Sequence, residues 1–238
     1  MKNNKIILVE PLHYVLQGEG KNLGKKMILL RLAGCNIQCP DCDTMYSWKF
    51  SEKDQLLYYT TENLLREIYK INNKKNINYL LITGGEPSIW EKPLLELFLS
   101  LELFYFDIET SGYTEWSLIK NHKEIQKRIQ FNISPKIGAL KPKVDLDIKN
   151  IQILKQPPLN YIVKIVTSIH TFKKDLKKIE EMIQYYNIPR NKIYLMPFAK
   201  TREELLRESD FLIEQCFKFG FEFSPRLHIL LFDTDRLK

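Results

Sequence analysis

The sequence predicts an α/β protein, built as an open, partial β/α barrel in a single domain over residues 1–238. Apolar strand-like stretches alternate with helix-like stretches along most of the chain, a pattern typical of a parallel sheet covered by helices. Six or so such units fit a partial barrel better than the roughly 250 residues of a complete eightfold barrel. No linker rich in Gly, Pro or Ser divides the chain, so we expect one domain.

Each expected strand is a short apolar run that ends at polar or turn residues, as YIVKIVT does at 161–167. The stretch TTENLLREIYKI (60–71) is typical of a helix, because Thr60 is a good cap and Leu64 and Ile68 follow at helical spacing. The expected strands are 27–33, 78–82, 104–110, 129–133, 161–167, 192–198 and 226–232; the expected helices are 60–71, 92–101, 175–186 and 201–219, the last closed by Gly220.

Composition narrows the class of protein. Apolar residues make up 44% and charged residues 27% of the chain, which are ordinary values for a globular protein. No apolar run approaches the ~18 residues of a membrane span, and we see no signal peptide. The net charge of +7 comes from lysines scattered among acids, which indicates a solvated surface rather than a nucleic-acid footprint. We expect a cytoplasmic chain without membrane or nucleic-acid partners, in which the thiols stay reduced.

Glycine is scarce and unevenly placed. The chain has nine glycines, and most of them stand in short polar stretches that follow expected strands. Since the carboxyl ends of parallel strands meet at one edge of the sheet, we expect these stretches to line a site there. The glycines concerned are Gly18, Gly20, Gly34, Gly84, Gly85 and Gly112.

Three of the four cysteines stand in RLAGCNIQCPDCDTMYSW, where Cys35, Cys39 and Cys42 have the spacing Cys-x3-Cys-x2-Cys. Structural zinc takes four ligands, and no histidine lies near. A nucleophilic cysteine would need one thiol with a histidine base. Three thiolates suit an iron–sulfur cluster that leaves one iron open. We call residues 34–48 the cysteine loop, and we expect Cys216 to be a small buried residue of its helix.

The cysteine spacing, followed by TGGEP at 83–87, resembles the radical S-adenosylmethionine (SAM) enzymes. In that superfamily SAM chelates the open iron of a 4Fe–4S cluster and is cleaved to a 5′-deoxyadenosyl radical, which abstracts a hydrogen atom. The resemblance implies that the cysteine loop holds such a cluster. Asp41 stands where many members carry an aromatic residue beside the adenine, so that contact is not transferred.

Further motifs narrow the resemblance to the 7-carboxy-7-deazaguanine synthase family of the queuosine and 7-deazapurine pathways. They are LQGEG (16–20), RLAGCNIQCPDCDT (31–44), TGGEP (83–87), ETSG (109–112), SPK (134–136), LMP (195–197) and PRLHILL (225–231). The resemblance implies a lyase that converts 6-carboxy-5,6,7,8-tetrahydropterin to 7-carboxy-7-deazaguanine and ammonia, with SAM regenerated and Mg2+ assisting. It also implies a homodimer that receives electrons from a protein such as flavodoxin or ferredoxin.

The resemblance also implies residue roles. Cys35, Cys39 and Cys42 would hold the cluster, Thr44 would offer a hydroxyl to Mg2+, and Arg31 would pair with the substrate carboxylate through its guanidinium fork. The other expected substrate residues are Leu16, Gln17, Gly18, Thr83 and Glu109; the expected SAM residues are Gly85, Glu86, Ser111, Ser134, Pro135 and Lys136. No side chain is expected to be catalytic, because SAM and the cluster carry the radical chemistry.

His228, on the expected last strand, is interpreted as a core or edge histidine. The sequence departs from the family at two places. FAKT follows LMP where members often carry glutamate and glycine, and the tail continues after Leu231, so no substrate contact of the chain terminus is assigned here.

Two alternatives remain. A glycyl-radical-enzyme activase of the same superfamily would explain the cysteines but not Arg31 or the LQGEG and PRLHILL motifs. A nucleic-acid-binding module stapled by zinc would need a fourth ligand and a basic stripe, neither of which the sequence offers.

Overall fold

The computed structural model of the protein describes residues 5–51, 54–137 and 146–233, so the other positions of the expected domain lie outside the described residues. Within these described ranges, ten strands form one sheet in the order β10-β9-β8-β7-β6-β5-β3-β1-β4, with β2 paired to β3 beside this path. The strands are β1 (Ile6–Leu8), β2 (His13–Leu16), β3 (Lys26–Leu32), β4 (Leu57–Tyr59), β5 (Tyr79–Gly84), β6 (Tyr105–Thr110), β7 (Ile129–Ile133), β8 (Tyr161–Thr167), β9 (Ile193–Pro197) and β10 (Glu222–Phe223).

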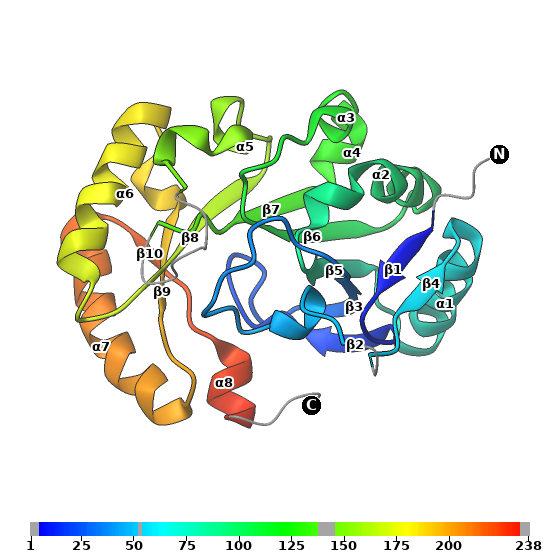
Figure 1. Ribbon diagram of the computed structural model, residues 1–238, viewed down its shortest axis with the longest axis horizontal. Coiled ribbons are helices and arrows are strands. Elements are labelled where there is room, and N and C mark those ends of the chain that lie inside the picture. The colour runs from blue at the N-terminus through cyan, green and yellow to red at the C-terminus, as the bar shows by residue number, and fades with distance from the viewer. Residues whose placement is uncertain (1–4, 52–53, 138–145, 234–238) are drawn as a thin grey trace.

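Most of the helices lie around the outside of this curved sheet, the last one lies at its open side, and the cysteine loop crosses its inner side (Figure 1). The α-helices are α1 (Thr61–Lys75), α2 (Glu91–Ser100), α3 (Ser117–Lys120), α4 (Lys123–Lys127), α5 (Gln152–Lys155), α6 (Phe172–Tyr186), α7 (Arg202–Phe219) and α8 (Leu227–Phe232). Single 3-10 turns are η1 (Met45–Ser47), η2 (Pro87–Trp90), η3 (Ile148–Asn150) and η4 (Arg190–Lys192).

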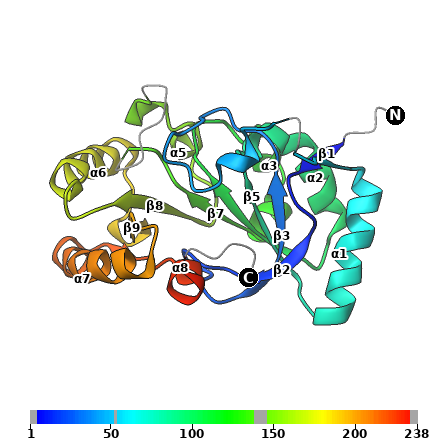
Figure 2. The same cartoon turned by 60° about the horizontal axis from the view of Figure 1, so that its bottom comes forward.

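The strands β3, β5, β6, β7, β8 and β9 run parallel in consecutive pairs. This confirms the open β/α barrel, with β7 and β8 at the predicted bounds. Antiparallel β1, β2 and β4 extend the sheet beyond β3 and were not predicted. With β1 and β4 forming one end of the sheet and the short β10 the other, the barrel stays open (Figure 2).

Helix boundaries follow local capping chemistry. The Thr60 hydroxyl accepts the amide of Asn63 at the start of α1, and Thr201 accepts the amide of Glu204 at the start of α7. Gly220 ends α7 with φ +70°, a backbone conformation that glycine adopts without steric cost. Cys216 is buried in α7, as predicted.

The seventh strand, predicted at 226–232, is wrong: residues 227–232 form helix α8. A short apolar run fits either structure, and here the edge of the sheet beyond β9 is already taken by β10. The helix instead packs Ile229 and Leu230 against Ala199 and Leu205. This places His228 on a helix, which corrects its expected position on a strand.

The two faces of the parallel sheet differ because side chains alternate along each strand. In β8, Val163 and Ile165 belong to the main apolar core, while Lys164 between them points to the opposite face. In β6, Phe106 and Ile108 join the same core and Asp107 and Glu109 alternate with them. The outer face is therefore apolar beneath the helices, and the inner face carries charge.

Candidate functional site

The cysteine loop leaves β3 directly beside the TGGEP loop (83–87) that follows β5. The amide of Gly85 donates to the Leu32 carbonyl at 2.9 Å, and the amide of Glu86 donates to the Gly34 carbonyl at 2.8 Å. A Cβ atom at Gly85 would lie 1.6 Å from the Gly34 oxygen. The glycine is therefore required for the two loops to approach this closely.

Cys35, Cys39 and Cys42 are all free thiols of the cysteine loop. Burial raises the pKa of Cys35 and of Cys39, and the positive charge of Lys136 opposes the shift at Cys39. In the described part of the chain, no three thiol, imidazole or carboxylate side chains converge on a point where one ion would sit. Three thiols without a fourth fit a cluster, in which each thiolate binds a different iron.

Cys216 does not join this set. It is buried in α7, where its thiol donates to the Glu222 carbonyl at 3.2 Å.

Glu86 joins the TGGEP loop to the ETSG loop (109–112). One carboxylate oxygen accepts the Thr110 hydroxyl at 2.6 Å and the Ser88 amide at 3.1 Å. The other accepts the Ser111 amide at 2.8 Å and the Ser111 hydroxyl at 2.6 Å. Since both oxygens of this buried side chain are engaged, a ligand that bonded to Glu86 would have to displace one of these donors.

The SPK stretch (134–136) lies at the same edge of the sheet. The Ser134 amide donates to the Thr110 carbonyl at 2.7 Å, and Lys136 Nζ lies 3.2 Å from the Ser134 hydroxyl. Pro135 is buried. The residues predicted to meet SAM therefore gather around the cysteine loop, on three neighbouring strand ends.

The inner face is organised around Lys164, which is 2% exposed. Its Nζ lies 2.7 Å from Glu19 Oε2 and 2.5 Å from Glu109 Oε2. Burial raises the pKa of Glu109 to about 7, against the attraction of Lys164. Burial alone would also raise the pKa of Glu19, but the charges of Lys164 and Arg226 hold it well below its usual range. Of the two acids, Glu109 is thus the one whose negative charge is less fully offset by neighbouring positive charge.

Gln17 extends this network. Its Nε2 donates to Asp107 Oδ2 at 2.7 Å and to Glu109 Oε1 at 3.3 Å. The Asn132 amide also donates to Glu109 Oε1, at 3.1 Å. Asn132 Oδ1 is buried and has no hydrogen-bond partner among the described residues, so the network contains one unpaired acceptor. Burial raises the pKa of Asp107.

Arg31 and Thr83 stand opposite each other in the register of β3 and β5. Arg31 Nε donates to Glu10 at 2.9 Å, and its guanidinium lies 5.7 Å from the Tyr46 ring centroid. The Thr44 hydroxyl lies 3.5 Å from the Gly84 carbonyl. These predicted residues therefore stand at the strand ends next to the cysteine loop.

The QGEG loop (17–20) packs against α8. The Leu227 amide donates to the Gly18 carbonyl at 2.9 Å, and a Cβ atom at Gly18 would lie 2.6 Å from His228 Nδ1. His228 Nε2 is 4.0 Å from Glu19, and burial lowers the pKa of its imidazole. Leu16, just before the loop, is 51% exposed.

Sequence reasoning missed several polar residues of the inner face. A signal was present: FYFDIET, IQFNI and YIVKIVT each place polar side chains at alternate positions of an otherwise apolar strand. Since the period of a strand is two residues, these residues had to share the face opposite the core. The residues missed on these strands are Asp107, Asn132 and Lys164; Arg226, which precedes α8, was also missed and has no such signal.

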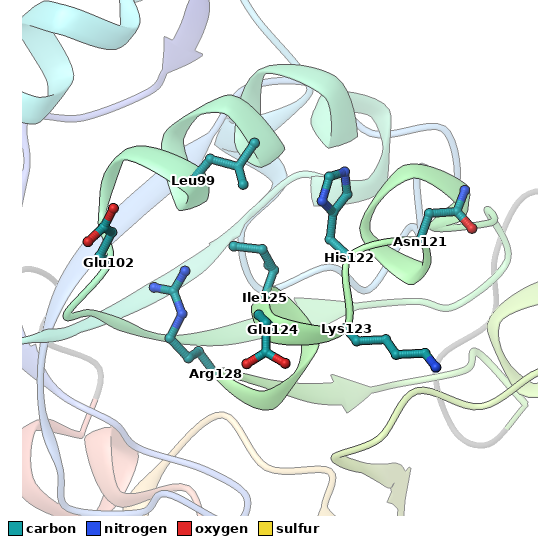
Figure 3. A pocket seen from close by; sticks show the side chains of 8 residues that line it. All are labelled: Leu99, Glu102, Asn121, His122, Lys123, Glu124, Ile125 and Arg128. Atoms are coloured by element: carbon teal, nitrogen blue, oxygen red, sulfur yellow. The ribbon is translucent and has the colours of Figure 1, made fainter.

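A separate hollow of about 510 Å³ lies on the outside of the molecule, between α2 and the α3–α4 region. Figure 3 shows Leu99, His122 and Arg128 among the side chains that line it. None of the predicted site residues lines this hollow, so it is separate from the site.

The fold and this edge of the sheet define a single-cluster iron–sulfur protein. The family model described as "4Fe-4S single cluster domain" matches residues 16–152. The 7-carboxy-7-deazaguanine synthase of Pyrobaculum aerophilum is 30% identical over 94% of this chain and 93% of its own. The 7-carboxy-7-deazaguanine synthase of Hyperthermus butylicus is 28% identical, over 96% of this chain and 94% of its own.

A crystal structure of QueE from Escherichia coli matches with a TM-score of 0.71 at 25% identity, covering 94% of this chain and 95% of that one. The chain belongs to the 7-carboxy-7-deazaguanine synthases, which are radical SAM enzymes. Within the described ranges, no helix combines the length and apolarity needed to cross a membrane.

Proposed function

We propose that the chain converts 6-carboxy-5,6,7,8-tetrahydropterin to 7-carboxy-7-deazaguanine with loss of ammonia, as a radical SAM lyase of queuosine and 7-deazapurine biosynthesis that uses SAM catalytically. The observation that carries the proposal is the match to named synthases over nearly the full length of both chains. The charged inner face beside the cysteine loop supports a small polar substrate rather than a protein loop, which the activase alternative would require.

The chain's own residues suit a carboxylated pterin. Arg31 would engage the substrate carboxylate with its guanidinium, since the fork geometry matches both oxygens. Gln17 would offer its side-chain amide to the polar edge of the ring by giving up its contact with Asp107 or Glu109, and the buried Asn132 oxygen would accept without giving up a partner. Thr83, beside Arg31 in the register, would add a hydroxyl. Such contacts fix the ring relative to the cysteine loop, and positioning is a large part of catalysis.

Three groups that fit these residues would be held at the same edge. Cys35, Cys39 and Cys42 would bind the 4Fe–4S cluster, while Gly85, Ser111 and the SPK stretch would meet SAM. When bound, the cluster and SAM supply the radical that removes a hydrogen atom from the substrate. The Thr44 hydroxyl would bind Mg2+, an ion that keeps most of its ligands as water and substrate oxygens.

Lys136 has a second role in this proposal. Its charge acts on the Cys39 thiol and its Nζ lies beside Ser134, so it would stabilise negative charge on both a thiolate and the SAM carboxylate. We further propose a cytoplasmic homodimer that receives electrons from a protein such as flavodoxin or ferredoxin.

The proposal is tested by anaerobic reconstitution with iron and sulfide, reduction, and addition of SAM, Mg2+ and the pterin, with products followed by mass spectrometry. We expect a product lighter than the substrate by one ammonia, formed in excess over 5′-deoxyadenosine. SAM cleavage with the pterin untouched would contradict the substrate, and a protein that takes up zinc but no cluster would contradict the whole reaction class.

A further inference from the structure

Arg226 joins three segments that are far apart in the sequence. It immediately precedes α8 and is 7% exposed. Its Nη2 lies 2.5 Å from Asp43 Oδ2, its Nε lies 3.3 Å from Glu19 Oε1, and its Nη1 donates to the Ala199 carbonyl at 2.8 Å. The cysteine loop, the QGEG loop and the segment after β9 therefore meet at one guanidinium.

The two acids that contact Arg226 both stand next to predicted site residues. Asp43 stands between Cys42 and Thr44, the last cysteine and the predicted Mg2+ ligand of the cysteine loop. Glu19 follows Gln17 and Gly18, and its second oxygen accepts from Lys164, which also pairs with Glu109. A continuous ionic chain thus runs from the cysteine loop through Arg226 to the inner face of the barrel.

The geometry of Arg226 favours a specific role over general surface stabilisation. Asp43 is 65% exposed in its side chain, whereas Arg226 and Glu19 are 9% and 17% exposed. The buried guanidinium is held by Glu19 and by the Ala199 carbonyl, while the Asp43 carboxylate approaches it from the solvent side. The contact with Asp43 is therefore the one by which Arg226 holds the cysteine loop.

We propose that Arg226 is a positioning residue that fixes the Cys42–Thr44 segment of the cysteine loop relative to the QGEG loop. The order of one loop then depends on the order of the other. Part of this inference rests on the proposed function, because the QGEG loop is its proposed substrate contact. The mechanical coupling of the two loops does not depend on the reaction.

The coupling is tested on the apo-protein by hydrogen exchange of peptides from 17–20 and 34–48. We expect Arg226→Met to speed exchange in both loops roughly tenfold, the size expected for loss of charge-assisted hydrogen bonds. Asp43→Asn should affect 34–48 alone. The double variant should exchange in 34–48 no faster than Arg226→Met, because the two changes remove one interaction. Arg226→Lys, which keeps the charge, should be intermediate.

The matched control is Arg190→Met. Arg190 also donates three side-chain hydrogen bonds, two to Glu180 at 2.8 and 2.7 Å and one to the Phe219 carbonyl at 3.1 Å, on the helical exterior. Exchange in both loops should match wild type in this variant. The proposal is overturned if Arg190→Met speeds both loops equally, if Arg226→Met leaves 34–48 unchanged, or if the Asp43 and Arg226 effects simply add.

A kinetic readout connects the coupling to the reaction. In the reconstituted enzyme, Arg226→Met should raise the KM for the pterin by roughly tenfold, with a smaller change in kcat, while SAM binding is retained. Equal loss in kcat and SAM binding would overturn the positioning role. If wild type does not act on the pterin at all, the proposed function fails while the exchange experiment still decides the coupling.

Discussion

Lys164 and Ile165 are neighbours on β8, yet they occupy opposite environments. Ile165 lies in an apolar core beneath the helices, where burial itself is the stabilising interaction. Lys164 is equally inaccessible but faces two carboxylates, and burying charge costs free energy even when it is paired. The outer face of the sheet therefore holds the fold together, and the inner face keeps a costly arrangement that serves the site.

The largest effects are expected at the cysteine loop. Replacing Cys35, Cys39 or Cys42 by Ala should abolish the visible absorption of the reconstituted cluster and the activity with it, since each thiolate would hold one iron of the proposed cluster. Cys216→Ala is the control, because that thiol is engaged with Glu222 in α7. Loss of the cluster in the Cys216 variant, or its survival in any of the other three, would contradict the assignment.

The second-largest effect is expected for Lys164→Met, which should lower the free energy of unfolding. Without the ammonium, Glu19 and Glu109 stay buried without their shared partner, and breaking a buried pair in this way costs about 3–5 kcal/mol. Urea unfolding at pH 8 measures the change in the free energy of unfolding. The loss should be smaller at pH 6, where Glu109 takes up a proton; a loss that does not vary with pH would contradict the network.

The stability of the wild-type protein should depend on pH through Glu109. Because its pKa is raised to about 7 from 4.5, the folded state binds this proton more tightly than the unfolded chain does. The resulting stability is present below about pH 4.5 and is lost as pH rises through 7. Between pH 5 and pH 8 we expect the free energy of unfolding to fall by about 1–3 kcal/mol from this group.

Glu109→Gln should flatten that part of the pH profile. Glu124→Gln, which alters a side chain that is 82% exposed, should leave the profile as in wild type. An unchanged slope in Glu109→Gln would mean that burial does not raise the pKa of this acid.

The smallest effect sharpens the contrast between the two faces. Ile165→Val removes one buried methylene group from the outer core, which typically costs about 0.5–1.5 kcal/mol. Pterin binding and cluster absorption should not change, because Ile165 faces away from the site. A loss of pterin binding larger than the loss of stability would show that the two faces are not independent.

The sequence predicted the parts of the molecule that depend on local patterns. The cysteines, the TGGEP loop and most strands follow from spacing, glycine placement and apolar runs. The alternation in YIVKIVT places Lys164 on the inner face, but its pairing with Glu19 and Glu109 arises only when the fold brings them together. The same holds for Arg226 with Glu19 and Asp43. The strand predicted at 226–232 was wrong because a short apolar run does not distinguish a strand from a buried helix.

Binding of 6-carboxy-5,6,7,8-tetrahydropterin to the anaerobic, cluster-loaded protein with SAM tests the central claim, that the inner face beside the cysteine loop is the substrate site. We predict that Arg31→Ala raises the Kd of the pterin by roughly 10- to 100-fold, the size of a lost charge-assisted contact. Cluster absorption and SAM binding should be retained, and Arg66→Ala, at an arginine that is 71% exposed, should bind as wild type does. Unchanged pterin affinity in Arg31→Ala, or loss of SAM binding instead, would contradict the account.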